Sequence, residues 1–111
     1  MQARADVPVA DPADPTTLDG LFQVQCRDLI DQIRTMGFEP HIWVDMINDL
    51  GATTAAKRIL ASNMTLVATR WLIDQGRPEL TLEHEIMEVR WADLFDDDER
   101  SEAQRRLLNP R

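Results

Sequence analysis

Apolar residues recur at three- and four-residue spacing along most of the chain from Thr16 onward, which is the period of amphipathic α-helices. The first such stripe follows Thr16 and Thr17, either of which can cap a helix start, and it stops at Gly37, a residue type that commonly ends helices. The stripe comprises Phe22, Cys26, Leu29, Ile30, Ile33 and Met36. The pattern predicts a first helix with one buried face.

The next two helices are predicted from Pro40 to Gly51 and from about Thr53 to Ser62. Proline suits the first turn of a helix, because the amide that it lacks would have no partner there. The second helix is expected to bury Ile42, Trp43, Met46, Ile47 and Leu50. The third is expected to bury Ala55, Ala56, Ile59 and Leu60.

Three more helices are predicted in the second half of the chain. A fourth ends at Gly76, and a fifth is capped by Thr81. Asp96 and Glu99 have the spacing of a capping box, which opens a last helix that stops before Pro110. The expected inward residues are Leu66, Val67, Trp71 and Leu72, then Leu82, Ile86 and Val89, then Ala103 and Leu107. A short apolar connector holds Trp91, Leu94 and Phe95.

No segment shows the alternation of a β-strand, so the predicted fold is all-α, a compact bundle of five or six short helices. Residues 1–15 contain Pro8, Pro12 and Pro15 without apolar periodicity, and they are predicted to be a disordered tail. Residues 16–111 are predicted to form a single helical domain, a usual size for one core.

Composition and charge favour an ordinary soluble protein. The chain is 43% hydrophobic and 29% charged, and its net charge of −8 disfavours non-specific binding to nucleic acid or to an anionic membrane. No apolar run approaches the ~20 residues of a membrane span, and the first residues lack the apolar core of a secretory signal. A cytoplasmic location is therefore expected. The lone Cys26 is expected to be a small buried residue.

Three ordered motifs carry a resemblance to known proteins. They are Gly51-Ala52-Thr53-Thr54-Ala55-Ala56-Lys57-Arg58, then Gly76-Arg77-Pro78-Glu79-Leu80-Thr81-Leu82-Glu83, then Leu94-Phe95 with Glu99-Arg100. With these motifs, residues 37–108 resemble an uncharacterised family of small bacterial helical modules, found alone or attached to larger proteins, some of which handle DNA. The resemblance implies the helical fold and brings no activity, cofactor or catalytic residue. Residues 62–70 depart from the family pattern.

A DNA-binding interpretation rests on three basic residues. Lys57, Arg58 and Arg70 lie in a helix–break–helix segment that superficially echoes a helix-turn-helix. Its turn lacks glycine, and phosphate contacts supply most of the affinity for DNA, for which this acidic chain has few bases. Packing between helices is the favoured explanation of the segment.

The acidic run from Asp93 to Glu102 has two functional interpretations besides helix capping. The first is a divalent-metal site, but the run lacks the alternating ligands and the glycine of a calcium loop. As a DNA-mimicking surface it would fit the net charge, but acidic residues are expected at a helix start for electrostatic reasons alone.

Catalytic and metal motifs find little support in the sequence. His84, Glu85 and Glu88 resemble part of a zinc-protease helix, but the second histidine is missing and His41 belongs to another helix. There is no nucleophile elbow and no glycine-rich phosphate loop, and Asp45 with Asp49 shows no sign of a pocket. We therefore expect no enzyme, cofactor or metal.

The sequence favours a non-enzymatic interaction module, an adaptor or regulatory subunit that binds another protein through an apolar helical groove. Tryptophan is enriched at binding hot spots, and Trp91, then Trp43, is the expected exposed anchor. The alternative is a nucleic-acid-associated protein of bacterial defence or regulation, which binds DNA through its basic residues or mimics it through residues 93–102.

Overall fold

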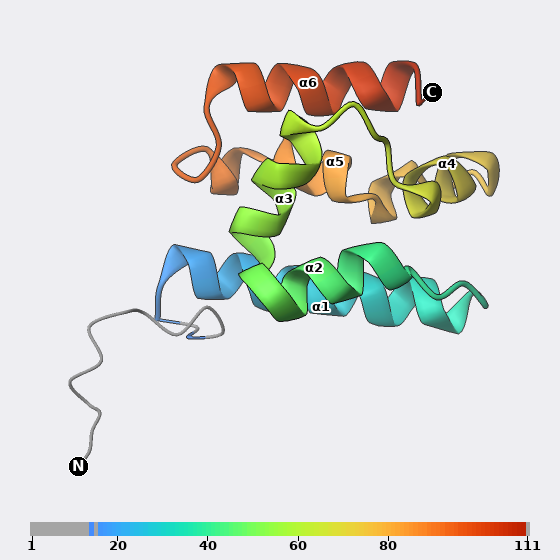
Figure 1. The fold of residues 1–111 in the computed structure, drawn as a ribbon, viewed down its shortest axis with the longest axis horizontal. Coiled ribbons are helices and arrows are strands. Elements are labelled where there is room, and N and C mark those ends of the chain that lie inside the picture. Colours follow the sequence, from blue (N-terminus) through green and yellow to red (C-terminus); the bar gives the residue numbers. More distant parts are fainter. Residues whose placement is uncertain (1–13, 15, 111) are drawn as a thin grey trace, which may run out of the picture.

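The computed structural model describes residue 14 and residues 16–110, and their regular structure is entirely helical (Figure 1). The six α-helices and two short 3-10 helices are α1 (Leu18–Thr35), α2 (His41–Leu50), α3 (Ala52–Ala61), α4 (Val67–Asp74), η1 (Pro78–Leu80), α5 (Leu82–Ile86), η2 (Val89–Trp91) and α6 (Asp97–Leu108). The all-α prediction is confirmed. The predicted tail falls, apart from Asp14, outside the described residues.

Helix α3 connects the two sides of the molecule. In Figure 1 it runs from α1 and α2 at one side to α6 at the other, with α5 packed beneath α6. Helix α4 lies at the end of the molecule where α1 passes into α2. None of the helices in residues 16–110 has the length and apolar character needed to cross a membrane.

The predicted helix-capping residues and helix-ending glycines are confirmed. The hydroxyls of Thr17 and Thr81 accept hydrogen bonds from the first turns of α1 and α5, and Asp96 forms a capping box with Glu99 at the start of α6. Three glycines, Gly37, Gly51 and Gly76, have positive φ angles just after a helix, where other residues would be strained.

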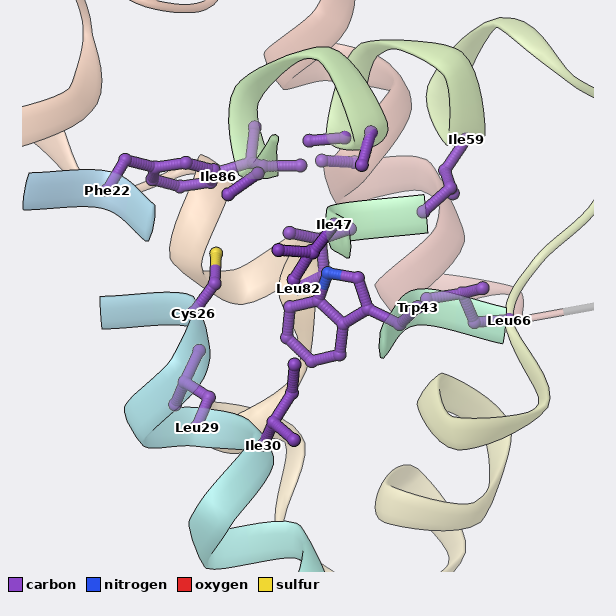
Figure 2. Close-up of a cluster of buried hydrophobic side chains, with 14 of the residues drawn as sticks. Phe22, Cys26, Leu29, Ile30, Trp43, Ile47, Ile59, Leu66, Leu82 and Ile86 are labelled. Atoms are coloured by element: carbon purple, nitrogen blue, oxygen red, sulfur yellow. The ribbon is translucent and has the colours of Figure 1, made fainter. Parts of the chain in front are cut away.

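The apolar stripes meet in one core, part of which Figure 2 shows. The indole of Trp43 lies in the middle of this view, between residues of α1, such as Ile30, and Leu66. Cys26 is buried as expected, and burial raises the pKa of its thiol well above the ordinary value. Phe22 makes edge-to-face contacts with both Trp91 and Phe95, with ring centroids 5.2 Å apart in each pair.

Several predicted inward positions are wrong. Ile42 is 45% exposed and Val67 53% exposed, because each lies in the first turn of a helix whose inner face is formed by later residues. Val89 is exposed because α5 ends at Ile86, so it no longer continues the stripe of that helix. Conversely, Glu83 in the first turn of α5 is fully buried.

Both ends of α3 are capped by side chains from other helices. Its start at Gly51 offers no side chain, and the buried Gln23 of α1 accepts a hydrogen bond from the amide of Ala52 at 2.9 Å. Its end is covered by Arg106 of α6, which is 1% exposed. These two residues satisfy backbone groups that every helix leaves without an internal partner.

All five N–H donors of Arg106 have partners. Nη1 donates to the carbonyls of Ile59 and Met64 at 2.9 and 2.7 Å, and Nη2 to those of Leu60 and Ser62 at 3.2 and 2.6 Å. Nε donates to Glu102 at 2.6 Å. Hydrogen bonds from Arg105 and Arg106 lower the pKa of Glu102 to about 2, so the buried guanidinium faces an ionised carboxylate at neutral pH.

We expect Arg106→Lys to destabilise the protein by about 3 kcal/mol or more, because an ammonium cannot reach four carbonyls and a carboxylate, and unpaired buried carbonyls are costly. Urea unfolding measures the effect. The matched control is Arg105→Lys, at the preceding position. Arg105 also pairs with Glu102, but it is exposed, so its replacement should have little effect. Equal stability of the two variants would contradict the role given to Arg106.

Candidate functional site

An apolar groove opens where α2 and α4 begin. Its volume is about 210 Å³, and its surface is almost entirely apolar. The lining residues are Phe38, Glu39, Pro40, His41, Ile42, Trp43, Leu66, Val67 and Ala68. The exposed side chains of Ile42 and Val67 therefore belong to a concavity rather than to isolated surface positions.

Contacts with residues outside the groove hold the wall that residues 38–40 form. Phe38 stacks on Trp71 of α4 with ring centroids 4.9 Å apart. Glu39 accepts two hydrogen bonds from Arg34 at 2.8 and 2.9 Å, and these lower the pKa of its carboxyl. The groove is thus preformed, with its one acidic side chain already paired.

Helix α4 is held in place by a buried carboxyl of α5. The hydroxyl of Thr69 donates to Glu83 Oε1 at 2.7 Å, and both residues are buried. Glu83 Oε2 has no hydrogen-bond partner among the described residues. Burial raises the pKa of Glu83 above its ordinary value, although the bond from Thr69 opposes that shift.

Neither tryptophan expected as an exposed anchor is exposed, so that prediction is wrong. Trp91 is 3% exposed, packs against Phe22, and donates from its indole to the buried Glu85, which also accepts from Arg90. Trp43 is 1% exposed. A connector between helices can be covered from several sides, which its local sequence does not reveal.

Trp43 nevertheless forms part of the groove floor. Its indole nitrogen has no partner among the described residues and lies on the side of Ile47 and Leu82, inside the core (Figure 2). The nitrogen is therefore unsuited to bind an occupant of the groove. The half-buried tryptophan beside the groove is Trp71.

The three basic residues of the DNA-binding alternative are not equivalent. Lys57 donates to both oxygens of Glu99, at 2.9 and 3.1 Å, and lies over the ring of Phe95. Arg58 and Arg70 are exposed, the first near the end of α3 and the second in α4. Lys57 thus joins α3 to α6, which the sequence did not indicate.

The acidic run is partly used inside the fold. Asp96 and Glu99 cap α6, Glu99 also binds Lys57, and Glu102 binds Arg106. The exposed acids without such bonds among the described residues are Asp93, Asp97 and Asp98. Less negative surface remains for a DNA mimic than the run suggests.

The zinc-like motif does not form a shared helical face. Helix α5 ends at Ile86, so Glu88 lies beyond the helix that carries His84. Within residues 16–110, no group of three or more histidine, cysteine, aspartate or glutamate side chains is arranged to hold a metal ion. Asp45 and Asp49 are exposed on α2, outside the groove lining.

Comparison of the chain with family models, curated proteins and solved structures finds no match. The resemblance to bacterial helical modules therefore stays a prediction.

The buried Glu83 predicts how the stability of the protein changes with pH. Because its pKa is raised in the folded state, its full contribution to stability is present below the ordinary value of 4.5 and is lost as pH rises through the folded pKa. We expect Glu83→Gln to gain stability relative to the natural protein between pH 4.5 and 7, measured by urea unfolding.

The control is Glu79→Gln, at an exposed carboxyl whose pKa is lowered by Arg77. A lowered pKa contributes stability that is present above the ordinary value of 4.5 and is lost as pH falls below it, so the difference in stability between this variant and the natural protein should stay nearly constant between pH 4.5 and 7. Parallel curves for Glu83→Gln and the natural protein would show that burial does not perturb Glu83.

Proposed function

We propose that this protein is a non-enzymatic helical interaction module, an adaptor or regulatory subunit that binds another protein through the groove between α2 and α4. The observation that carries the proposal is the preformed apolar concavity with Ile42 and Val67 exposed at its edges. Exposed apolar surface gathered in one concave place is typical of interaction sites.

The size of the groove favours a protein side chain over a small molecule. Its volume of about 210 Å³ is smaller than the ~300–1,000 Å³ of common ligand pockets. It exceeds the ~150 Å³ of an engineered cavity that holds benzene. One aromatic or branched aliphatic side chain of a partner therefore fits.

The chemistry of the lining supports a binding role. None of the nine lining residues is a serine, threonine, cysteine or lysine, so the groove offers no common nucleophile. Its imidazole, His41, has Glu39 for a neighbour, but that carboxylate is bound to Arg34 and is a poor base.

The alternative, association with nucleic acid, is supported by two of the three basic residues expected to bind DNA. Arg58 and Arg70 are exposed and make no ion pair among the described residues, whereas Lys57 is bound to Glu99. A cytoplasmic location is also still a prediction from the sequence.

The test is an affinity pull-down from the lysate of the native host, with and without nuclease, comparing the natural chain with Val67→Glu. Glutamate at the first position of α4 is favourable for the helix but places a charge at the groove. The matched control is Val24→Glu, at a position 51% exposed on α1. We expect a near-stoichiometric protein partner with the natural chain and the control, and at least a tenfold loss with Val67→Glu.

Circular dichroism and urea unfolding establish that both variants fold. A partner retained equally by all three chains would place the interaction elsewhere and overturn the groove as the site. Partners that disappear with nuclease would favour the nucleic-acid alternative.

A further inference from the structure

Helix α4, which supplies one wall of the groove, has few attachments to the rest of the fold. It is 8 residues long and begins without a side-chain cap, and an isolated helix of that length is marginal in water. The residues that it buries are Ala68, Thr69 and Leu72. The hydroxyl of Thr69 forms a polar attachment to the buried Glu83 of α5. The groove wall therefore depends on a titratable carboxyl.

The surroundings of the Glu83 carboxyl favour its neutral form. Glu83 is fully buried, its Oε1 accepts the hydrogen bond from Thr69 at 2.7 Å, and its Oε2 has no partner within residues 16–110. A buried carboxylate oxygen without a donor costs much more free energy than the same oxygen in a protonated acid. Ionisation of Glu83 is therefore unfavourable unless water reaches it.

Among the described residues, Arg106 of α6 is the charged group that acts on Glu83. Its charge lowers the pKa of Glu83, but burial outweighs this effect, and the pKa stays above the ordinary value. The N–H donors of Arg106 are bound to four carbonyls and to Glu102, so it cannot pair with Glu83. Cys26 of α1 is a buried neutral thiol. The other ionisable groups on α4, η1 and α5 are exposed, half-buried or hydrogen-bonded elsewhere, namely Arg70, Asp74, Glu79, His84 and Glu85.

Resting on the proposed function, we infer that the protonation of Glu83 controls the groove: when Glu83 loses its proton to solvent, α4 separates from α5 and displaces the wall that carries Val67. Separation lets water reach the carboxylate. Helix α5 stays in place because it is packed against α6 and η1, whereas α4 lies at the end of the molecule (Figure 1). The binding site is thus complete in weakly acidic conditions and weakens as the pH rises.

The direction of this effect follows from the linkage between proton binding and conformation. With α4 in place the pKa of Glu83 is raised, and with α4 released the solvated carboxyl returns towards the ordinary value of 4.5. The state that binds the proton more tightly is favoured at low pH, so rising pH favours the release of α4. Glutamine has nearly the shape of protonated glutamate and does not ionise. Glu83→Gln should therefore hold α4 in place at every pH.

The test follows the ¹³Cα chemical shifts of residues 67–74 by NMR in the full, isotope-labelled protein at pH 5 and at pH 8. These shifts report helical backbone, and a released α4 is too short to stay helical by itself. We expect residues 67–74 to lose about half or more of their helical shift at pH 8, while residues 97–108 of α6 keep theirs. Glu83→Gln should keep α4 helical at both pH values. The control, Glu79→Gln at an exposed carboxyl, should behave like the natural protein.

Two NMR results would overturn the inference. One is a helical α4 at pH 8 in the natural protein, and the other is an equal loss of helix in Glu83→Gln. The pull-down, repeated at pH 5 and pH 8, tests the consequence for the groove. The natural chain should retain at least about threefold less partner at pH 8, and Glu83→Gln should retain the same amount at both. A partner retained equally by the natural chain at both pH values would overturn control of the groove.

This inference and the proposed function fail in different ways. A partner lost with Val67→Glu, together with an α4 that stays helical at pH 8, would leave the groove as a protein-binding site that Glu83 does not control. An α4 released at pH 8, together with a partner retained by Val67→Glu, would overturn the groove as the binding site. The NMR measurement needs no partner, so it tests the release of α4 by itself.

Discussion

The arrangement of the helices depends on the burial of one charged side chain. Arg106 inserts from α6 against the end of α3, where four carbonyls and the carboxylate of Glu102 accept all of its N–H donors. An unpaired guanidinium at this depth would be very costly, so α6, the end of α3 and residues 62–64 are compatible only in one mutual placement. The loop that leads to α4 is fixed as a consequence.

The groove is a product of that placement. Residues 62–66 run from the carbonyls bound by Arg106 to the start of α4, and Glu83 holds α4 through Thr69. Meanwhile Phe38 is held against Trp71 and Glu39 against Arg34. Both walls are supported by contacts outside the groove, and such preorganisation lowers the entropic cost of binding.

Buried polar residues recur at the joints between helices of this fold. Gln23 caps α3, Glu83 binds α4, and Glu85 gathers Gln25, Arg90 and the indole of Trp91. Each of these bonds joins segments that an apolar core alone would allow to slide. Polar contacts inside a core are directional, so they select one packing among several of similar hydrophobic burial.

The sequence by itself determined the helices and most of their ends, because caps such as Thr81 and turns such as Gly37 act through residues three or four positions away. Only the tertiary structure decided the burial of Arg106, whose carbonyl partners lie 42 to 47 positions earlier in the chain. It also decided the exposure of Val67 and the burial of Trp91. A periodic stripe tells which face of a helix is apolar, but neighbouring helices determine which part of that face they cover.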